Sequence, residues 1–169
     1  MRWLALRLFG LGLALGWACA VPAQHLKTPW PSRVAAPALE WVDVSGRPWS
    51  LDQLAGKVVV INFWATWCAP CLEELPSLQT LLEFSRDAEL VVLTVNVKDP
   101  LARIQQFVSR NGFTFPVVSD RQGAMARQWG VKVFPTSVMI SPQGKPVWLI
   151  EGAVDWAGRE AGEWIRALQ

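Results

Sequence analysis

The chain has few of the residue types from which many protein sites are built. Its 169 residues include three cysteines, one histidine and no tyrosine. A tetrahedral zinc site needs about four ligands, and the sequence holds no second cysteine or histidine cluster that could complete one. His25 has no neighbour of metal-binding type, so we interpret it as an incidental residue of its segment. We therefore expect no bound metal.

An excess of charge of one sign is also missing. Lys and Arg number 16 and Asp and Glu number 14, which gives a net charge of +2. Two of the basic residues, Arg2 and Arg7, lie in a predicted leader, and without them 16 − 2 = 14 basic residues face 14 acidic ones. Proteins that bind a phosphate backbone carry a basic stripe. We therefore expect no nucleic-acid partner.

Residues 1–23 have the pattern of a secretory signal peptide. A positively charged start is followed by the short apolar run Leu8–Trp17 and by small residues that suit cleavage. An uncleaved anchor is the alternative, although the run is short for a span of about 20 residues. A lipid-modified Cys19 is a third possibility, disfavoured by the bulky Trp17 two positions earlier. All three place the rest of the chain outside the cytoplasm.

The remainder divides into a linker and one domain. Residues 24–38 contain several prolines and no hydrophobic periodicity, which predicts a linker. Residues 39–169 are enough for one domain with its own core. Strands that alternate with helices favour a sheet with parallel inner strands and helices on both faces, to which the last hairpin adds antiparallel edges. The predicted strands are 39–44, 47–49, 57–64, 89–97, 115–119, 136–141 and 145–152, and the predicted helices are 50–54, 68–85, 99–110, 123–129 and 155–168.

The most informative stretch is the apolar run Val58–Trp64, which leads to Cys68 and Cys71. β-Branched and apolar residues without alternation indicate a buried central strand. A helical pattern follows, so Cys68 lies at a helix N-terminus, where unpaired N–H groups and the helix dipole favour a thiolate. Cys71 lies one turn further, within reach of a disulfide. Because a disulfide across so short a loop adds almost no stability, we interpret the pair as a redox site.

The stretch resembles the thioredoxin fold and, within it, the TlpA/ResA-like thiol–disulfide oxidoreductases that bacteria export. The resemblance covers residues 39–169 and rests on residues 56–71, on Glu74 and Pro76, and on residues 130–136, which read Gly-Val-Lys-Val-Phe-Pro-Thr. It implies an α/β, thioredoxin-like fold in which helices flank a central mixed sheet. An N-terminal β-hairpin and an inserted helix would be additions to that fold.

The resemblance assigns roles to the cysteine pair. Cys68 is expected to attack a partner's disulfide, and Cys71 to resolve the mixed disulfide that results. Ala69 and Pro70 form the active-site loop between them and bring no charge or imidazole that would favour the thiolate. We therefore expect a reducing pair, with a potential nearer to about −270 mV than to about −120 mV.

Glu74 is the candidate proton carrier. It shares a helical face with leucines, whereas Glu73 faces the polar side. Burial would raise the pKa of Glu74 and let it exchange a proton with Cys71. A solvated surface position is the ordinary alternative, and the family match favours burial. Asn62 stands where many thioredoxins carry a buried aspartate, and it cannot take a proton.

Three further residues are expected to bind substrate. By resemblance, the Phe134–Pro135 peptide bond is cis and lies beside the thiols. The backbone of Phe134 could then pair with an extended substrate segment. Trp67 is expected to be partly exposed and to form an apolar rim for the partner's disulfide loop.

The resemblance implies a protein-disulfide reductase in the periplasm, soluble or tethered to the membrane by its N-terminus, and monomeric. Its substrates would be disulfide-containing proteins, such as a cytochrome apoprotein during cytochrome c maturation, a copper-handling protein or, in antioxidant defence, a damaged envelope protein. A membrane electron donor of the DsbD/CcdA type would regenerate the dithiol. We expect no cofactor beyond the disulfide between Cys68 and Cys71.

Other functions remain open from the residues alone. A disulfide oxidase or isomerase could use the same pair at a different reduction potential. A non-enzymatic copper or zinc carrier could use it as a metal ligand, although no histidine supports it. A peroxidase is disfavoured because no Pro-x-x-x-Thr-x-x-Cys sequence precedes Cys68.

Overall fold

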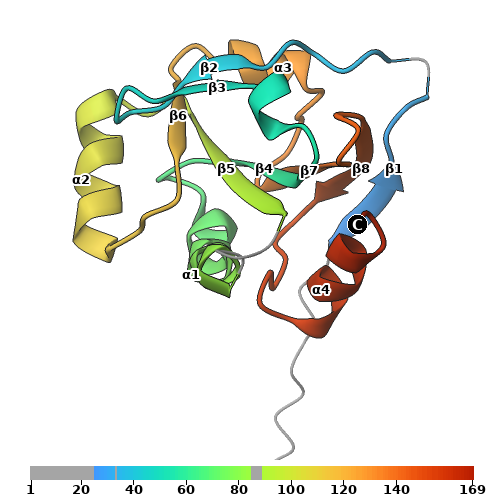
Figure 1. Ribbon diagram of the computed structural model, residues 1–169. Coiled ribbons are helices and arrows are strands. Elements are labelled where there is room, and N and C mark those ends of the chain that lie inside the picture. Colours follow the sequence, from blue (N-terminus) through green and yellow to red (C-terminus); the bar gives the residue numbers. More distant parts are fainter. Residues whose placement is uncertain (1–24, 33, 85–88) are drawn as a thin grey trace, which may run out of the picture.

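The computed structural model describes residues 25–32, 34–84 and 89–169, so the predicted leader lies outside the described residues. Most of the described chain is arranged around a six-stranded mixed sheet (Figure 1). Its strands are β1 (Leu26–Pro29), β4 (Val58–Trp64), β5 (Leu90–Val97), β6 (Val117–Asp120), β7 (Thr136–Ile140) and β8 (Pro146–Glu151). Their spatial order is β1-β8-β7-β4-β5-β6.

Strand β4 lies inside the sheet, as its sequence predicted. All of its residues are buried, because elements cover both faces of the sheet. It pairs in parallel with β5 and antiparallel with β7, and β5 pairs in parallel with β6. The carboxyl end of β4 therefore opens at the same edge as that of β5, where loops of open α/β sheets place their sites.

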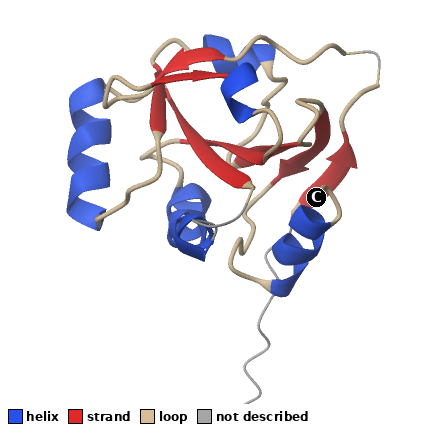
Figure 2. Ribbon diagram, in the orientation of Figure 1, coloured by secondary structure: helices blue, strands red, loops and turns tan. Residues whose placement is uncertain are grey.

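Two layers cover the sheet (Figure 2). Helices α1 (Ala69–Phe84) and α4 (Arg159–Arg166) lie on one face, and α2 (Leu101–Asn111) lies at the β6 end. The other face carries the hairpin of β2 (Glu40–Val42) and β3 (Pro48–Ser50), the 3₁₀ turn η1 (Asp52–Leu54) and α3 (Ala124–Gln128). This arrangement is the mixed sheet with flanking helices, N-terminal hairpin and inserted helix that the sequence predicted.

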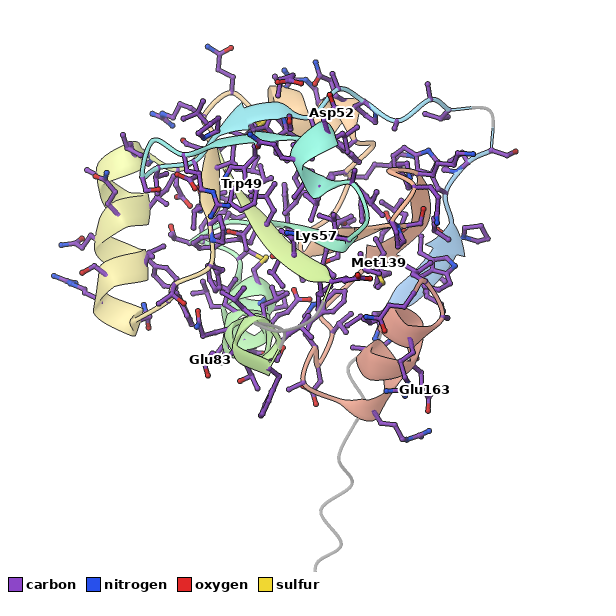
Figure 3. The ribbon with its side chains drawn as sticks, viewed as in Figure 1. Trp49, Asp52, Lys57, Glu83, Met139 and Glu163 are labelled. Atoms are coloured by element: carbon purple, nitrogen blue, oxygen red, sulfur yellow. A yellow bond between two sulfur atoms is a disulfide. The ribbon has the colours of Figure 1, made fainter. Side chains whose placement is uncertain are left out.

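Each layer has its own apolar core, because successive β4 side chains point to opposite faces. Figure 3 shows side chains filling both spaces, while Glu83 and Glu163 lie on the outer surface of their helices. The core under α1 and α4 includes Val58, Val60, Trp64, Leu75, Leu78, Trp156 and Trp164. The opposite core includes Trp41, Trp49, Val59, Ile61, Phe63 and Trp129.

The structure differs from the sequence prediction at the edge of the sheet. Part of the predicted linker, Leu26–Pro29, forms β1 and pairs antiparallel with β8. Neither strand of the last hairpin is therefore at the edge of the sheet, because β1 covers β8 and β7 lies between β4 and β8. Contacts that the local sequence does not reveal hold β1 in place: the Lys27 ammonium lies 4.2 Å from the ring centroid of Trp148 and 4.7 Å from that of Trp164.

Two helices also differ from the prediction. Residues 155–168 were predicted as one helix, but α4 spans only Arg159–Arg166, because residues from Asp155 to Gly158 form a turn closed by a Gly158 N–H to Asp155 C=O bond of 3.0 Å. The helix predicted over residues 99–110 is α2, which begins at Leu101 and ends at Asn111. In it Leu101 is 49% exposed and only Ile104 is fully buried. Among the described residues, no helix has the length and apolarity needed to span a membrane.

Candidate active site

The two cysteines lie where β4 passes into α1. Cys68 directly precedes Ala69, the first residue of the helix, and forms a disulfide with Cys71 in the first turn. The Cys71 N–H donates to the sulfur of Cys68 at 3.3 Å. When the pair is reduced, the same N–H and the helix dipole would stabilise a Cys68 thiolate. Cys68 keeps 7% of its surface exposed and Cys71 none, so a partner can reach only the first sulfur.

Glu74 is buried under the pair. It lies one helical turn beyond Cys71 and is 3% exposed. Residues three apart on a helix have Cβ atoms about 5–6 Å from each other, so Cys71 and Glu74 are neighbours on the same face of α1. The exposed neighbour Glu73 points to solvent, which matches the expected difference between the two glutamates.

Three donors bind the Glu74 carboxyl. The indole N–H of Trp156 and the backbone N–H of Val154 donate to Oε1, the second at 3.3 Å. The side-chain amide of Asn62 donates to Oε2 at 3.2 Å. Each bond stabilises the ionised form, but the loss of hydration is the larger effect and raises the pKa of Glu74 from 4.5 to about 7. A carboxyl of this pKa can both accept and release a proton near neutral pH.

The sequence did not predict that the loop before α4 supplies two of these donors, the Trp156 indole and the Val154 N–H. Trp156 was expected in the last helix, but it lies in the loop before α4 and is 1% exposed. The backbone N–H of Trp156 donates to the hydroxyl of Ser77 on α1 at 3.0 Å. The loop is thereby held against α1, and its indole is directed at Glu74. The only sequence signal was the tryptophan itself, at the start of the helix predicted over residues 155–168.

An apolar rim borders the disulfide. Trp67 is 58% exposed, as expected, and its ring packs edge-on against Phe134 with centroids 5.6 Å apart. The Phe134–Pro135 peptide bond is cis, also as expected. Phe134 is half-buried and Pro135 is buried, whereas Ala69 and Pro70 are exposed beside the disulfide. The rim could contact the apolar side chains around a partner's disulfide.

A buried aspartate, which the sequence placed only at the start of the helix predicted over residues 99–110, holds the loop before Cys68. Asp99 is 2% exposed, and its carboxylate accepts hydrogen bonds from the backbone N–H of Thr66 at 2.7 Å and from its hydroxyl at 2.8 Å. The side-chain amide of Asn96 donates a third bond at 2.9 Å. Asp99 thus ties the end of β5 to the residue two positions before Cys68. Only its place after a predicted strand could have drawn attention to it.

The arrangement supplies the parts of a thiol–disulfide exchange. An accessible sulfur lies at a helix N-terminus, a buried sulfur lies behind it, and a buried carboxyl that titrates near neutrality lies within one turn. In the described part of the chain, no group of three or more His, Cys, Asp or Glu side chains could hold a metal ion.

Known proteins are similar to the chain over most of its length. The model of the AhpC/TSA family matches residues 33–148. The thiol–disulfide oxidoreductase ResA of Geobacillus thermodenitrificans is 37% identical over 141 residues, which are 83% of this chain and 81% of that protein.

Solved structures agree with the sequence matches. A DsbF homologue from Corynebacterium diphtheriae superposes with a TM-score of 0.71 at 30% identity, over 84% of this chain and 92% of that one. A secreted thiol–disulfide isomerase from Corynebacterium glutamicum gives a TM-score of 0.71 at 26% identity, over 84% and 89% of the two chains. The chain therefore belongs to the AhpC/TSA family of thioredoxin-fold proteins and is similar, within it, to the ResA thiol–disulfide oxidoreductases.

Proposed function

We propose that this thiol–disulfide oxidoreductase reduces disulfides in partner proteins outside the cytoplasm. The observation that carries the proposal is the junction of β4 and α1, where an accessible Cys68 is backed by the fully buried Cys71 and by Glu74. The similarity to ResA and to a protein described as secreted supports both the chemistry and the compartment. The predicted leader is in accord with export.

The proposed reaction begins with the reduced pair. The Cys68 thiolate attacks one sulfur of the partner's disulfide, and the other partner sulfur leaves as a thiolate and takes a proton from solvent. Cys71 then gives its proton to the ionised Glu74 and attacks the Cys68 sulfur of the mixed disulfide. The second partner sulfur leaves and receives the proton from Glu74. The partner gains two electrons and two protons, and the Cys68–Cys71 disulfide forms.

The neutral loop between the cysteines favours the reducing direction. Neither Ala69 nor Pro70 can stabilise the Cys68 thiolate by charge, so the dithiol form is not strongly stabilised relative to the disulfide. Electrons for the next cycle would come from a membrane donor of the DsbD/CcdA type. We expect substrates such as cytochrome apoproteins, copper-handling proteins or damaged envelope proteins, and a monomeric enzyme, periplasmic and either free or tethered to the membrane.

Trapping the mixed disulfide tests the proposal. Cys71→Ala removes the resolving sulfur, so Cys68 should accumulate in cells as disulfide-linked adducts that dithiothreitol dissolves. The double variant Cys68→Ala/Cys71→Ala is the matched control and should give none. If Cys71→Ala forms no adduct above this control, partner reduction by Cys68 is wrong.

An isomerase or oxidase is the second candidate, because one of the similar structures is a thiol–disulfide isomerase. The reduction potential separates the two. A value near −270 mV supports the reductase, whereas a value near −120 mV, on the order of the strong oxidant DsbA, supports the oxidase. A glutathione redox titration of the Cys68–Cys71 pair measures it directly.

A further inference from the structure

One face of α2 lies beside the redox loop and carries positive charge that the described residues do not neutralise. A surface hollow of about 370 Å³ runs between Thr66 and this helix, and Arg103 and Arg110 both line it. The sequence of α2, LARIQQFVSRN, contains no acidic residue. Gln106 and Asn111 add amide groups along the same hollow.

These two arginines differ from most others that the structure describes. The guanidinium of Arg159 pairs with Glu163, that of Arg47 lies over the Trp49 ring, and those of Arg121 and Arg127 donate to backbone carbonyls. Among the arginine side chains within the described ranges, only those of Arg103, Arg110 and Arg166 have no ion pair, hydrogen bond or ring contact. Two of these three converge on the same hollow, and both are exposed.

The hollow also lies within reach of the chemistry. Thr66 is two residues before Cys68, so the two Cα atoms are at most about 7.6 Å apart. Asp99, the acidic group closest in the fold to Thr66, is 2% exposed, and its carboxylate already accepts three hydrogen bonds from Thr66 and Asn96. It is therefore not free to neutralise an arginine by direct contact. A partner whose disulfide reaches Cys68 therefore brings its neighbouring residues close to this hollow.

We propose that this hollow binds an acidic segment that flanks the disulfide of the partner protein. The proposal rests on the reductase function and narrows its substrates to proteins with carboxylates next to the reactive cysteine. Seven helical residues separate Arg103 from Arg110, a rise of about 10 Å. An extended chain covers that distance in about three residues, so two carboxylates three positions apart would meet both guanidinium groups.

Exchange kinetics with three disulfide peptides test the proposal. The peptides carry acidic, neutral or basic flanks, and an uncharged small disulfide gives the intrinsic reactivity of Cys68. The measured quantity is the rate constant for the acidic peptide divided by that for the small disulfide. For Arg103→Glu/Arg110→Glu we expect this ratio to fall about tenfold, because the side chains in the hollow would repel the acidic peptide instead of attracting it. For Arg103→Gln/Arg110→Gln the ratio should lie between those of this variant and wild type. Arg166→Glu, on α4 and far from α2 in Figure 1, is the matched control and should change nothing.

Two measurements separate the possible failures. If wild type does not reduce even the small disulfide, the reductase function itself is wrong. Binding of the acidic peptide with its cysteines replaced by serine still tests the hollow, because it needs no redox step, and loss of this binding in Arg103→Glu/Arg110→Glu supports the proposal. Equal effects of the double variant on all three peptides would overturn it. A second result would overturn the proposal in favour of an anionic membrane surface. In this result wild type, but not Arg103→Glu/Arg110→Glu, sediments with phosphatidylglycerol vesicles, and the substitutions leave the peptide rate constants unchanged.

Discussion

Replacing Glu74 by glutamine should remove a specific pH dependence of stability. The substitution keeps the size of the side chain and removes its ability to ionise. In the folded protein, burial raises the pKa of Glu74 from 4.5 to about 7. Between these two pH values the unfolded chain loses the proton while the folded protein keeps it. Folding therefore becomes less favourable as the pH rises through this window.

The size of the effect follows from the shift. A difference of about 2.5 pKa units corresponds to roughly 3 kcal/mol, at about 1.36 kcal/mol per unit. The contribution is fully present below pH 4.5 and is lost as the pH rises through 7. The stability of wild type minus that of Glu74→Gln should therefore fall by about 3 kcal/mol between pH 4 and pH 8.

Urea unfolding of the oxidised protein is the suitable assay. With the disulfide intact in the folded and unfolded states, neither cysteine titrates. Subtracting the unfolding free energy of Glu74→Gln from that of wild type cancels the contributions of the other titratable groups, which the two proteins share. Glu73→Gln, on the exposed side of the same helix, is the matched control and should run parallel to wild type. If the plot of unfolding free energy against pH for Glu74→Gln also ran parallel to that of wild type, Glu74 would titrate near its ordinary value. Its assignment as the proton carrier would then be refuted.

Three further predictions concern the surroundings of the site. Asp99→Asn should lower the free energy of unfolding in urea by about 1–3 kcal/mol. It should also lower the pKa of Cys68 in alkylation titrations, because it removes a buried negative charge near the thiolate. Thr66→Val should destabilise the fold without changing the pKa of Cys68, so equal Cys68 pKa values in the two variants would contradict an electrostatic effect of Asp99 on the thiolate. Phe134→Ala should slow the reduction of a protein disulfide several-fold but leave a small disulfide unaffected, and a uniform loss would argue against a binding rim with Trp67. Leu78→Ala should lower the free energy of unfolding by about 2–5 kcal/mol, as measured by urea titration, because Leu78 is fully buried.

The redox junction could be predicted because its determinants are local. An apolar run without alternation indicates a strand covered on both faces, and two cysteines at the start of a helical pattern fix their own geometry. The same reasoning correctly separated Glu74 from Glu73, because the helical period alone decides which of two neighbours faces the core.

The surroundings of the site could not be predicted because they depend on long-range contacts. The groups that donate to Glu74 come from positions 12, 80 and 82 residues away, and the two bonds from Thr66 to Asp99 span 33. No local pattern specifies which loop closes over which helix. The edge strand β1 was missed for the same reason, since its partner β8 lies more than a hundred positions further along the chain.

Strand β1 has a practical consequence for anyone who shortens the protein. Its four residues and the Trp30 N–H, which donates to Val147 C=O at 2.8 Å, occupy the outer side of β8. A chain trimmed to begin at residue 39, the boundary that composition suggests, would leave the outer edge of the six-residue strand β8 without its partner. An open edge of that length invites a second copy to add its own strand, so such a fragment should self-associate at concentrations where the longer chain does not.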